Sequence, residues 1–355
     1  MSVVVERLSK RFGTVTVIAD LTVNFRENAI SVLLGPSGSG KTTTLRCVAG
    51  LEEPNGGEIA IESRTVFSAR HKINLPPEER GLGMVFQSYA IWPHMTVFEN
   101  VALPLRAHRV ASGDVASRVT NALSMVNLDQ FRDRSATQLS GGQQQRVAIA
   151  RCIVNNPRLI LLDEPLGNLD AKLRVGMRGE LKDLQRRIGA TMIFVTHDQE
   201  EAMSLADEIF LFRDGDIAQQ GSPEDLYRRP KTRYVAEFLG KANLFRGTVC
   251  RERDGTFFVR VGAERLAITG DALMLDGGSC LCMVRPEAWK LGYPLGAGIR
   301  GRVESVMFIG DRSEVRVSTQ IGMQGVTLFG YEKVKVGEDV GLTVDPCLIH
   351  LLPDT

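Results

Sequence analysis

The sequence predicts an α/β domain followed by a smaller all-β domain. In the first two-thirds of the chain, short and fully apolar segments alternate with helical patterns, as expected of a parallel sheet covered by helices on both faces. After residue 236 the composition changes, because residues 236–355 hold 17 of the 35 glycines and several short runs rich in β-branched and aromatic residues. We therefore predict one domain over 1–235 and a second over 236–355.

The composition is typical of a soluble globular protein. Hydrophobic residues make up 43% and charged residues 24% of the 355 residues, and the formal net charge is +1. A chain this close to neutrality is not a non-specific binder of polyanions, although the average allows a local phosphate site. No apolar run approaches the roughly 18 residues needed to cross a bilayer. Of the six cysteines only Cys280 and Cys282 lie close together, without a nearby His, which favours reduced thiols over a metal site.

The apolar segments of the first domain are expected to be strands. Val3–Val5 comes first, and Ala29–Leu34 then leads into a glycine-rich turn and a helical pattern over Thr42–Ala49. Leu159–Leu162 and Met192–Val195 are two further buried strands. Further helices are expected near 142–155, 171–188 and 199–206. Ligands bind beyond the carboxyl ends of the strands in such sheets, so the polar residues after these strands form the candidate site.

The tail after residue 236 is expected to form a small β-barrel or a pair of barrels. Short strand-like runs occur along it, at Gly255–Val261, Leu281–Val284 and Glu314–Val317. Asp254-Gly255 is a hairpin turn signal. The sequences RGTV at 246–249 and RGRV at 300–303 resemble each other, and each is followed by a VRV run. This likeness indicates either a duplicated hairpin unit or chance.

Residues 35–42 form a phosphate-binding loop motif. The sequence Gly35-Pro36-Ser37-Gly38-Ser39-Gly40-Lys41-Thr42 fits the pattern G-x-x-x-x-G-K-[ST], follows an apolar strand and opens a helix. Its glycines let backbone N–H groups surround a phosphate, and the helix N-terminus adds partial positive charge. We expect Lys41 to reach the β- and γ-phosphates, Thr42 to hold Mg²⁺ through its hydroxyl, and Thr43 to touch the α-phosphate.

Two further elements support a nucleotide site. The apolar strand Leu159–Leu162 ends in Asp163 and Glu164. Asp163 is expected to bind Mg²⁺, directly or through water, and Glu164 to polarise the attacking water. Leu139-Ser140-Gly141-Gly142-Gln143 precedes a helix, with Ser140 as its N-cap and two glycines that allow an anion to approach the backbone. Alone this segment is a helix start, but beside the other two motifs it indicates a second anion site.

Together these motifs resemble those of the nucleotide-binding subunits of ATP-binding cassette (ABC) transporters, and the resemblance covers essentially the whole chain. The matching residues are the loop at 35–42, the LSGGQ signature at 139–143, LLDEP at 161–165, Gln87, Asp170, His197 and Phe12. One departure is the D-loop, Leu166-Gly167-Asn168-Leu169-Asp170, where Gly167 stands in place of the usual serine.

The resemblance implies a head-to-tail homodimer that binds ATP and Mg²⁺. Each ATP would lie between the loop at 35–42 of one copy and the signature of the other, where Ser140 and Gly142 would contact the γ-phosphate. Phe12 would stack on the adenine.

The resemblance also implies the roles of the hydrolytic residues. Glu164 would be the general base and His197 would contact the γ-phosphate. Gln87 would link Mg²⁺ and the attacking water to the membrane partner.

Two regions indicate the kind of cassette. Ser88–Leu105, within a helical subdomain expected over about 88–155, resembles the stretch of bacterial importer ATPases that receives a coupling helix of the permease. Exposed Trp92, Met95 and Phe98 would form a partner-binding patch there, or would simply pack in the subdomain. Val284-Arg285-Pro286-Glu287 and the RG-x-V segments resemble the OB-like (TOBE-type) regulatory β-barrel of the maltose, polyamine and ferric-iron importer ATPases.

The resemblance therefore implies the ATPase of a binding-protein-dependent importer, a translocase. It would lie peripherally on the cytoplasmic face of the inner membrane, bind two integral membrane permease subunits, and act indirectly with an extracytoplasmic solute-binding protein. The solute stays open among ferric iron, polyamine, phosphonate and sugar, with a preference for ferric iron or another small ion or polyamine. A soluble non-transport ABC ATPase is the alternative, but the sequence has neither a long coiled-coil insertion nor a second cassette. No nucleic acid is expected as a partner, because there is no basic excess.

Overall fold

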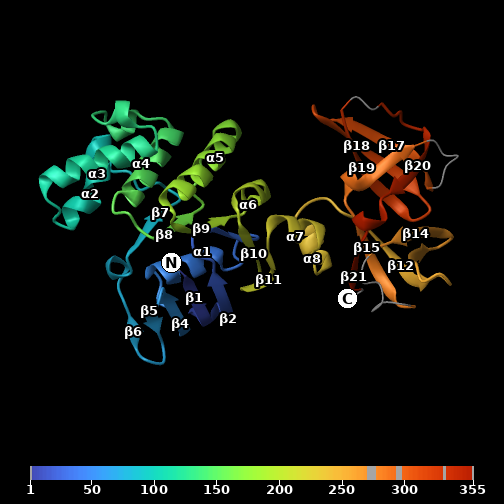
Figure 1. The fold of residues 1–355 in the computed structure, drawn as a ribbon, viewed down its shortest axis with the longest axis horizontal. Coiled ribbons are helices and arrows are strands. Elements are labelled where there is room, and N and C mark those ends of the chain that lie inside the picture. Colours follow the sequence, from blue (N-terminus) through green and yellow to red (C-terminus); the bar gives the residue numbers. More distant parts are fainter. Residues whose placement is uncertain (1, 270–276, 293–297, 331–332, 354–355) are drawn as a thin grey trace. The chain divides into compact units, whose positions relative to one another are not determined.

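Two units make up the chain in the computed structural model, which describes residues 2–269, 277–292, 298–330 and 333–353 (Figure 1). The first unit runs to Pro223 and the second begins at Glu224. The first is mixed α/β and the second is built of β-sheets, which confirms the predicted fold class. The domain limits at 1–235 and 236–355 stay a prediction, because a division into compact units does not locate the ends of the two modules.

A six-stranded sheet forms the centre of the first unit. In spatial order its strands are β11 (Asp216–Gly221), β10 (Glu208–Arg213), β3 (Ile30–Leu34), β9 (Thr191–Thr196), β8 (Leu159–Asp163) and β7 (Leu82–Val85). All are parallel except β11, which pairs antiparallel with β10 at one edge. Every residue of β3, β8 and β9 is buried, as the fully apolar segments predicted for a sheet covered on both faces.

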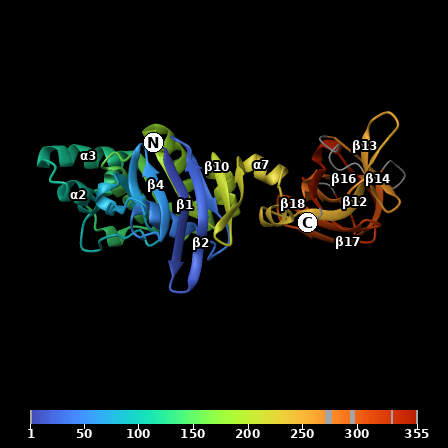
Figure 2. The same cartoon turned by 90° about the horizontal axis from the view of Figure 1, so that it is seen from below.

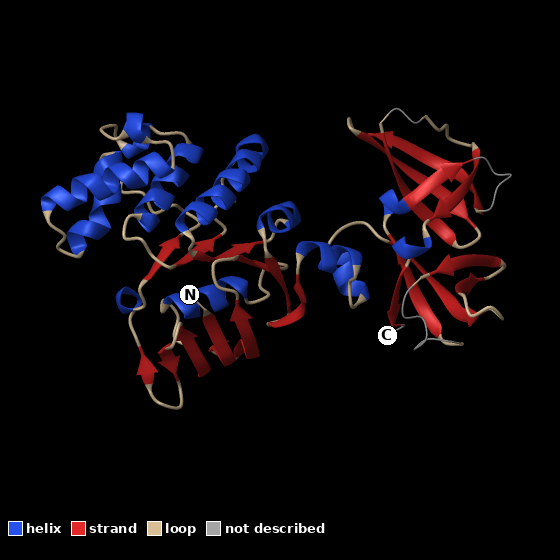
Figure 3. Cartoon of the chain, in the orientation of Figure 1, coloured by secondary structure: helices blue, strands red, loops and turns tan. Residues whose placement is uncertain are grey.

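A second sheet of the same unit is antiparallel. In spatial order it contains β2 (Val15–Phe25), β1 (Val3–Phe12), β4 (Gly56–Ile61), β5 (Arg64–Ser68) and β6 (Ile73–Asn74). Figure 2 shows β2, β1 and β4 side by side. Helix α1 (Lys41–Ala49) lies between the two sheets (Figure 3), and one hydrophobic cluster joins its side chains to both. The helix that follows the phosphate-binding motif is therefore fixed on two sides.

The remaining helices of the first unit lie on the other face of the central sheet (Figure 1). They are α2 (Val97–Ala107), α3 (Ser112–Met125), α4 (Gly141–Ile153), α5 (Ala171–Ile188) and α6 (Gln199–Leu205). Helices α2, α3 and α4 pack against one another and form the expected helical layer. Within the described ranges, every helix is too short or too polar to traverse a bilayer.

Two five-stranded antiparallel sheets make up most of the second unit and share one hydrophobic core. The first contains β14 (Glu264–Ile268), β13 (Phe257–Val261), β12 (Asn243–Arg251), β15 (Ser279–Val284) and β21 (His350–Pro353). The second contains β16 (Trp289–Gly292), β20 (Asp339–Val344), β17 (Ile299–Phe308), β18 (Arg312–Thr319) and β19 (Gly322–Phe329). The predicted hairpin turn at Asp254-Gly255 joins β12 to β13, with Gly255 at φ 93°.

The two similar segments of the tail lie on the middle strands of the two sheets, RGTV on β12 and RGRV on β17. Thr248 and Val249 pair with Arg260 and Val259 of the first VRV run, whereas only Val303 pairs with the second run, at Val317. A Cβ atom on Gly247 would lie 2.2 Å from Cγ1 of Val259, and one on Gly301 would lie 2.5 Å from Cγ1 of Val317. Both glycines therefore meet the same requirement, which is room for a valine on the neighbouring strand.

Candidate nucleotide-binding and catalytic site

Four adjacent parallel strands bring the predicted groups to one edge of the central sheet. The loop 35–40 follows β3, Gln87 follows β7, Glu164 follows β8 and His197 follows β9. The spatial order β3-β9-β8-β7 places these carboxyl ends next to one another.

The loop between β3 and α1 adopts a backbone that requires glycine. Gly35, Gly38 and Gly40 have φ values of 153°, 80° and 99°. A Cβ on Gly35 would lie 2.5 Å from the carbonyl oxygen of Phe212, so this position excludes any side chain. Gly40 is also the N-cap of α1. The first N–H groups of this helix therefore face the loop, which is the arrangement that binds phosphate.

Lys41 lies inside the loop. Its Nζ atom donates to the carbonyl oxygens of Gly35 at 2.9 Å and Pro36 at 2.7 Å, and it lies 3.5 Å from Oγ of Ser39. Burial lowers the pKa of this ammonium, while the carboxylates of Glu164 and Asp163 act in the opposite direction. The loop thus surrounds a desolvated cation, whose attraction for a phosphate is stronger than it would be in water.

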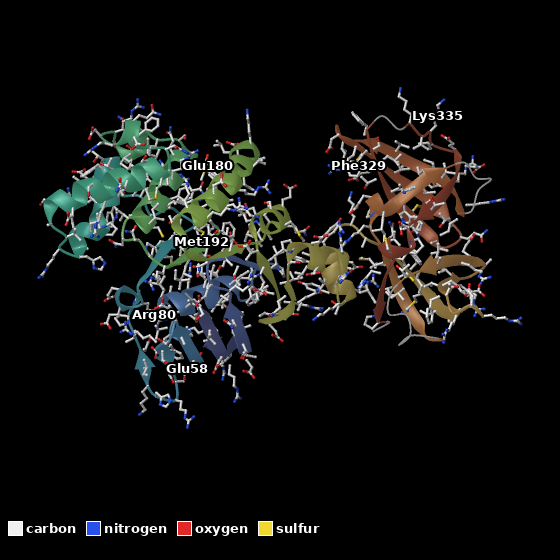
Figure 4. All side chains as sticks on the ribbon, viewed as in Figure 1. Glu58, Arg80, Glu180, Met192, Phe329 and Lys335 are labelled. Carbon is white, nitrogen blue, oxygen red and sulfur yellow. The ribbon has the colours of Figure 1, made fainter. Side chains whose placement is uncertain are left out.

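The other end of α1 is held by a buried arginine. Nη1 of Arg80, labelled in Figure 4, donates to the carbonyl oxygens of Cys47 at 2.8 Å and Val48 at 3.0 Å. A cation at a helix C-terminus interacts favourably with the helix dipole. Arg80 therefore helps to fix the helix that carries Lys41 and Thr42.

Thr42 and Asp163 form an oxygen-rich pair at the start of α1. Oγ1 of Thr42 donates to Oδ1 of Asp163 at 3.1 Å, and Nη2 of Arg46 lies 3.6 Å from Oδ2. Burial raises the pKa of Asp163, against the opposing effects of Thr42 and Arg46. Arg46 is one turn after Thr42 on α1, a spacing visible in the sequence that our prediction did not use.

The oxygens of Thr42 and Asp163 suit Mg²⁺. This ion prefers oxygen ligands and commonly takes only one or two from protein, with phosphates and water completing its shell. In the described part of the chain, no group of three or more His, Cys, Asp and Glu side chains could hold a metal ion by itself. These residues therefore fit a metal that arrives with a phosphate ligand better than a resident metal centre.

Glu164 is held by two side chains from neighbouring strand ends. Its Oε2 atom accepts from Nε2 of Gln87 at 3.1 Å, and its Oε1 atom lies 3.2 Å from Nδ1 of His197. Its backbone is left-handed, with φ 44°, and its N–H donates to the carbonyl oxygen of Val195 at 3.1 Å. A non-glycine residue in this conformation is strained, and such strain often accompanies function. The structure thus brings together the three predicted catalytic residues.

The D-loop joins this cluster through Asn168, which the sequence analysis did not single out. Nδ2 of Asn168 donates to the carbonyl oxygen of Gln87 at 2.9 Å. Asp170 is the N-cap of α5 and accepts from the N–H of Leu173. A Cβ on Gly167 would lie 3.4 Å from the carbonyl oxygen of Glu164, so a serine there would need only a small adjustment.

A second arginine ties the D-loop to the segment after β9. Nη2 of Arg174 donates to the carbonyl oxygen of Leu169, and Nη1 donates to Oδ2 of Asp198, both at 3.1 Å. Asp198 follows His197 directly and caps α6. Arg174 thereby connects the neighbours of two predicted site residues, Asp170 and His197.

The signature segment makes local contacts within this chain. Ser140 and Gln143 form a capping box at the start of α4, with Ser140 N–H donating to Oε1 of Gln143 at 2.9 Å. The predicted N-cap is present. Cβ atoms on Gly141 and Gly142 would lie 3.9 Å and 3.6 Å from the side chains of Leu169 and Leu173. The signature of one chain therefore lies beside its own D-loop.

The remaining predicted contact residues lie outside the cluster around Glu164. Phe12 is at the end of β1 and 46% exposed, with Nζ of Lys10 at 4.6 Å from its ring centroid. Trp92 is exposed as expected. Met95 and Phe98 are half-buried, so the prediction that all three are exposed was wrong for these two. The guanidinium of Arg132 lies 4.7 Å from the ring centroid of Phe98 and covers part of it.

Two family models match the sequence. The model described as ABC transporter matches residues 18–167, and the model described as TOBE domain matches residues 282–352. The first match contains the loop at 35–42, the signature and Glu164.

Similar proteins cover nearly the whole chain. An Fe(3+) ions import ATP-binding protein, FbpC of Agrobacterium fabrum, is 42% identical over 323 residues, which are 90% of this chain and 89% of that protein. A spermidine/putrescine import ATP-binding protein, PotA of Acetivibrio thermocellus, is 41% identical over 349 residues, or 98% and 95% of the two chains.

Solved structures resemble about three-fifths of the chain. The dimeric bacterial ABC transporter cassette MJ0796 has a TM-score of 0.54 and 32% identity, covering 62% of this chain and 98% of that one. CbiO1 of Clostridium perfringens, part of the ABC transporter complex cbiONQ, has a TM-score of 0.58 and 25% identity, covering 63% and 89%.

Proposed function

This chain belongs to the ABC transporter family, among its import ATP-binding proteins, and from that premise we propose how its residues act on ATP and what its transporter carries. The protein is an ATPase that energises an importer. The observation that carries the proposal is the pair of carboxylates at the C-terminal end of β8, where Asp163 is hydrogen-bonded to Thr42 and Glu164 to Gln87.

In the proposed mechanism, the loop at 35–42 binds the triphosphate of ATP. The N–H groups at the start of α1 donate to the phosphates, and Lys41 exchanges the Gly35 and Pro36 carbonyls for the β- and γ-phosphates. Thr43 donates to the α-phosphate, and Phe12 stacks on the adenine. Thr42 and Asp163, with Gln87 nearby, would hold Mg²⁺, which would supply positive charge to offset the charge that develops on the phosphate oxygens.

Glu164 is the proposed general base. It accepts a proton from water as the water oxygen attacks the γ-phosphorus, the bond between that phosphorus and the bridging oxygen breaks, and ADP leaves. Gln87 and His197 hold the two carboxylate oxygens at 3.1 Å and 3.2 Å, which supports a role for both in orienting the base. His197 would also contact the γ-phosphate.

The site is completed by a second copy in this proposal. Ser140, Gly141, Gly142 and Gln143 of the second copy bind the γ-phosphate, and Asp170 lies at the contact between copies. A symmetric dimer then contains two equivalent sites. Import ATP-binding proteins work with membrane permeases. We place the permease contact at Gln87 and Ser88–Leu105, the protein on the cytoplasmic face of the membrane, and a solute-binding protein outside it.

The solute is proposed to be a small cation, either ferric iron or a polyamine. Relatives named for these solutes match 90% and 98% of the chain. The ATPase itself does not contact the solute, so the test is uptake by cells that express the protein with its permease and binding protein. ATP-dependent accumulation of ⁵⁵Fe or labelled spermidine is expected, and uptake of a sugar or phosphonate alone would contradict the assignment.

Glu164→Gln tests the hydrolytic assignment. The amide retains the shape and hydrogen bonds of the side chain but does not accept the proton, so kcat should fall at least about 100-fold. Binding of ATP should persist, and the protein should accumulate as an ATP-bound dimer visible by size-exclusion chromatography with light scattering. Hydrolysis near the wild-type rate would refute Glu164 as the base.

A matched second variant tests the signature in the same experiment. Ser140→Arg in the Glu164→Gln background places a long cation where the partner's γ-phosphate is proposed to bind. The double variant should still bind ATP but remain monomeric. Ser117→Arg in the same background is the control, because Ser117 is exposed on α3, and this variant should dimerise. An ATP-bound dimer of the Ser140→Arg variant would contradict the proposed role of the signature.

A further inference from the structure

The segment after Gln87 contains two consecutive residues in a left-handed conformation. Tyr89 has φ 60° and Ala90 has φ 47°. Neither is glycine, so the Cβ atom of each disfavours this backbone and the conformation needs support from outside the segment. The Tyr89 side chain is buried, which anchors the segment at one point.

Arg151 supplies the support. Its Nη1 atom donates to the carbonyl oxygen of Ala90, and its Nη2 atom donates to that of Tyr89, both at 2.6 Å. The guanidinium thus binds the two strained residues with its planar fork, a geometry that a lysine does not reproduce. Burial lowers the pKa of Arg151, as expected for a cation removed from water.

The strained turn lies two residues from the catalytic cluster. Gln87 donates to Glu164 through its side chain, and its carbonyl oxygen accepts from Asn168. These two bonds require a particular path of the backbone at residues 87–90. Releasing Tyr89 and Ala90 from Arg151 would let this backbone relax towards right-handed or extended conformations, and the Gln87 amide would move relative to Glu164.

Arg151 is on the same helix as the signature. Helix α4 begins at Gly141, directly after Ser140, and Arg151 lies in its last turn. Ten residues of helix rise about 15 Å. A displacement of the N-terminus of α4 is therefore carried by a rigid element to the carbonyls of Tyr89 and Ala90.

We propose that Arg151 is a positioning residue for ATP hydrolysis, which makes the alignment of Gln87 with Glu164 depend on the position of the signature helix. The inference rests on the roles proposed above for Glu164 and the signature. It adds a physical link between them. When the signature at the N-terminus of α4 binds the nucleotide of the second copy, Arg151 in the last turn of α4 sets the position of Gln87 relative to Glu164.

Arg146 offers a matched control on the same helix. Its Nη1 atom donates to the carbonyl oxygen of Val126 at 3.0 Å, and its Nη2 atom lies 2.5 Å from Oε1 of Glu180 on α5. Glu180 is labelled in Figure 4. It is an arginine that also binds a backbone carbonyl, but its partners lie outside the segment after Gln87. If loss of stability alone lowers kcat, substitution of either arginine should lower it. If loss of positioning lowers kcat, only substitution of Arg151 should do so.

The experiment measures kcat and KM for ATP with the full-length protein, together with Tm. Arg151→Met should lower kcat about 10- to 100-fold, the range that small misplacement of reacting groups produces, while KM changes less than about 2-fold. Arg146→Met should lower Tm but leave the kcat of the folded protein within about 2-fold of wild type. Equal effects of the two variants on kcat would overturn the inference.

A double-mutant cycle with Gln87→Ala tests whether Arg151 acts through Gln87. If it does, adding Arg151→Met to Gln87→Ala should change kcat less than about 2-fold, because the group being positioned is already absent. Multiplicative losses would overturn the inference. If Arg151→Met fails to fold, Arg151→Lys replaces it and should give an intermediate kcat, with the same test of additivity.

Different results would contradict the proposed function and the inference about Arg151. Glu164→Gln with near wild-type hydrolysis would remove the proposed function and the inference with it. An inactive Glu164→Gln variant, combined with an Arg151→Met variant of unchanged kcat, would retain the function and remove only the inference.

Discussion

Asp163 shows a conflict between the site and the stability of the fold. Its side chain is buried, with Oδ1 bonded to Thr42 and Oδ2 near Arg46, yet burial still raises its pKa. The ionised form is therefore less favourable in the folded chain than in the unfolded chain. The carboxylate that we propose binds Mg²⁺ in its charged form is thus held where that charge reduces stability.

Asp163→Asn should accordingly stabilise the nucleotide-free protein at high pH. The folded-state pKa lies above the unfolded one, so ionisation weakens folding as pH rises from the unfolded pKa through the folded pKa. We expect the variant to melt at a higher temperature than wild type at pH 8. The advantage should vanish near pH 4.

Melting curves without Mg²⁺ or nucleotide check this, with exposed Glu200→Gln as a control for the loss of a surface carboxylate. A variant that is less stable than wild type at pH 8 but not at pH 4 would show that the bonds to Thr42 and Arg46 outweigh the desolvation of Asp163.

The sequence predicted the residues of local motifs but not those that connect distant segments. Lys41, Asp163 and Glu164 follow apolar strands in patterns that can be read within ten residues. Arg151 binds carbonyls 61 and 62 residues earlier in the chain, and any residue type offers those same carbonyl groups. A side chain that binds backbone leaves no complementary pattern in the partner's sequence, so only the structure identifies it.

At the scale of elements, the prediction gave nearly the full length of strands whose residues are all buried. It gave too short a length for a strand with exposed residues. Strands β3, β8 and β9 appear within one residue of the apolar runs that predicted them. The expected strand at Val3–Val5 continues to Phe12 as β1, whose later residues include the exposed side chains Glu6, Arg7 and Arg11. Polar residues on the solvent side of a sheet hide a strand from a search for apolar runs.

Strands β12 and β17 depend on one glycine each, and this gives a test of their equivalence. Gly247→Ala and Gly301→Ala should each lower the free energy of unfolding by about 1–3 kcal/mol, since the new Cβ overlaps a buried valine on the paired strand. Gly292→Ala, in β16 with nothing within 4 Å of its Cβ, should have little effect. Urea unfolding of the three variants measures this, and wild-type stability of Gly301→Ala would refute the equivalence.

At the scale of the whole molecule, Arg285 assigns two helices to the second unit. Helices α7 (Pro223–Arg228) and α8 (Arg233–Phe238) precede the strands, and the predicted boundary at residues 235–236 puts α7 in the first domain and divides α8. Arg285 donates to the carbonyl oxygens of Tyr227, Ala236, Gly240 and Lys241. Its guanidinium also lies 4.0 Å from the ring centroid of Tyr227, whose hydroxyl donates to Glu287 at 2.7 Å. The VRPE sequence thus connects these helices to β15.

Arg285→Met should loosen this connection without affecting the nucleotide site. Several carbonyl groups lose their donor, and each buried group left unpaired costs about 1–3 kcal/mol. We expect faster proteolysis within residues 224–241 and an unchanged Kd for ATP. Lys290→Met, an exposed change on β16, is the control. Unaltered proteolysis of Arg285→Met would show that other contacts hold the helices.

The Arg285 connection also limits where chains of this kind can be recombined. A chimera joined after Lys241 would take α7 and α8 from one parent and Arg285 from the other, so five hydrogen bonds would have to form between sequences that were not selected together. A junction before Glu224 takes Arg285 and all of its carbonyl partners from the same parent sequence. Exchange of the tail between relatives should therefore succeed at the earlier junction, although the TOBE-like sequence begins only at residue 282.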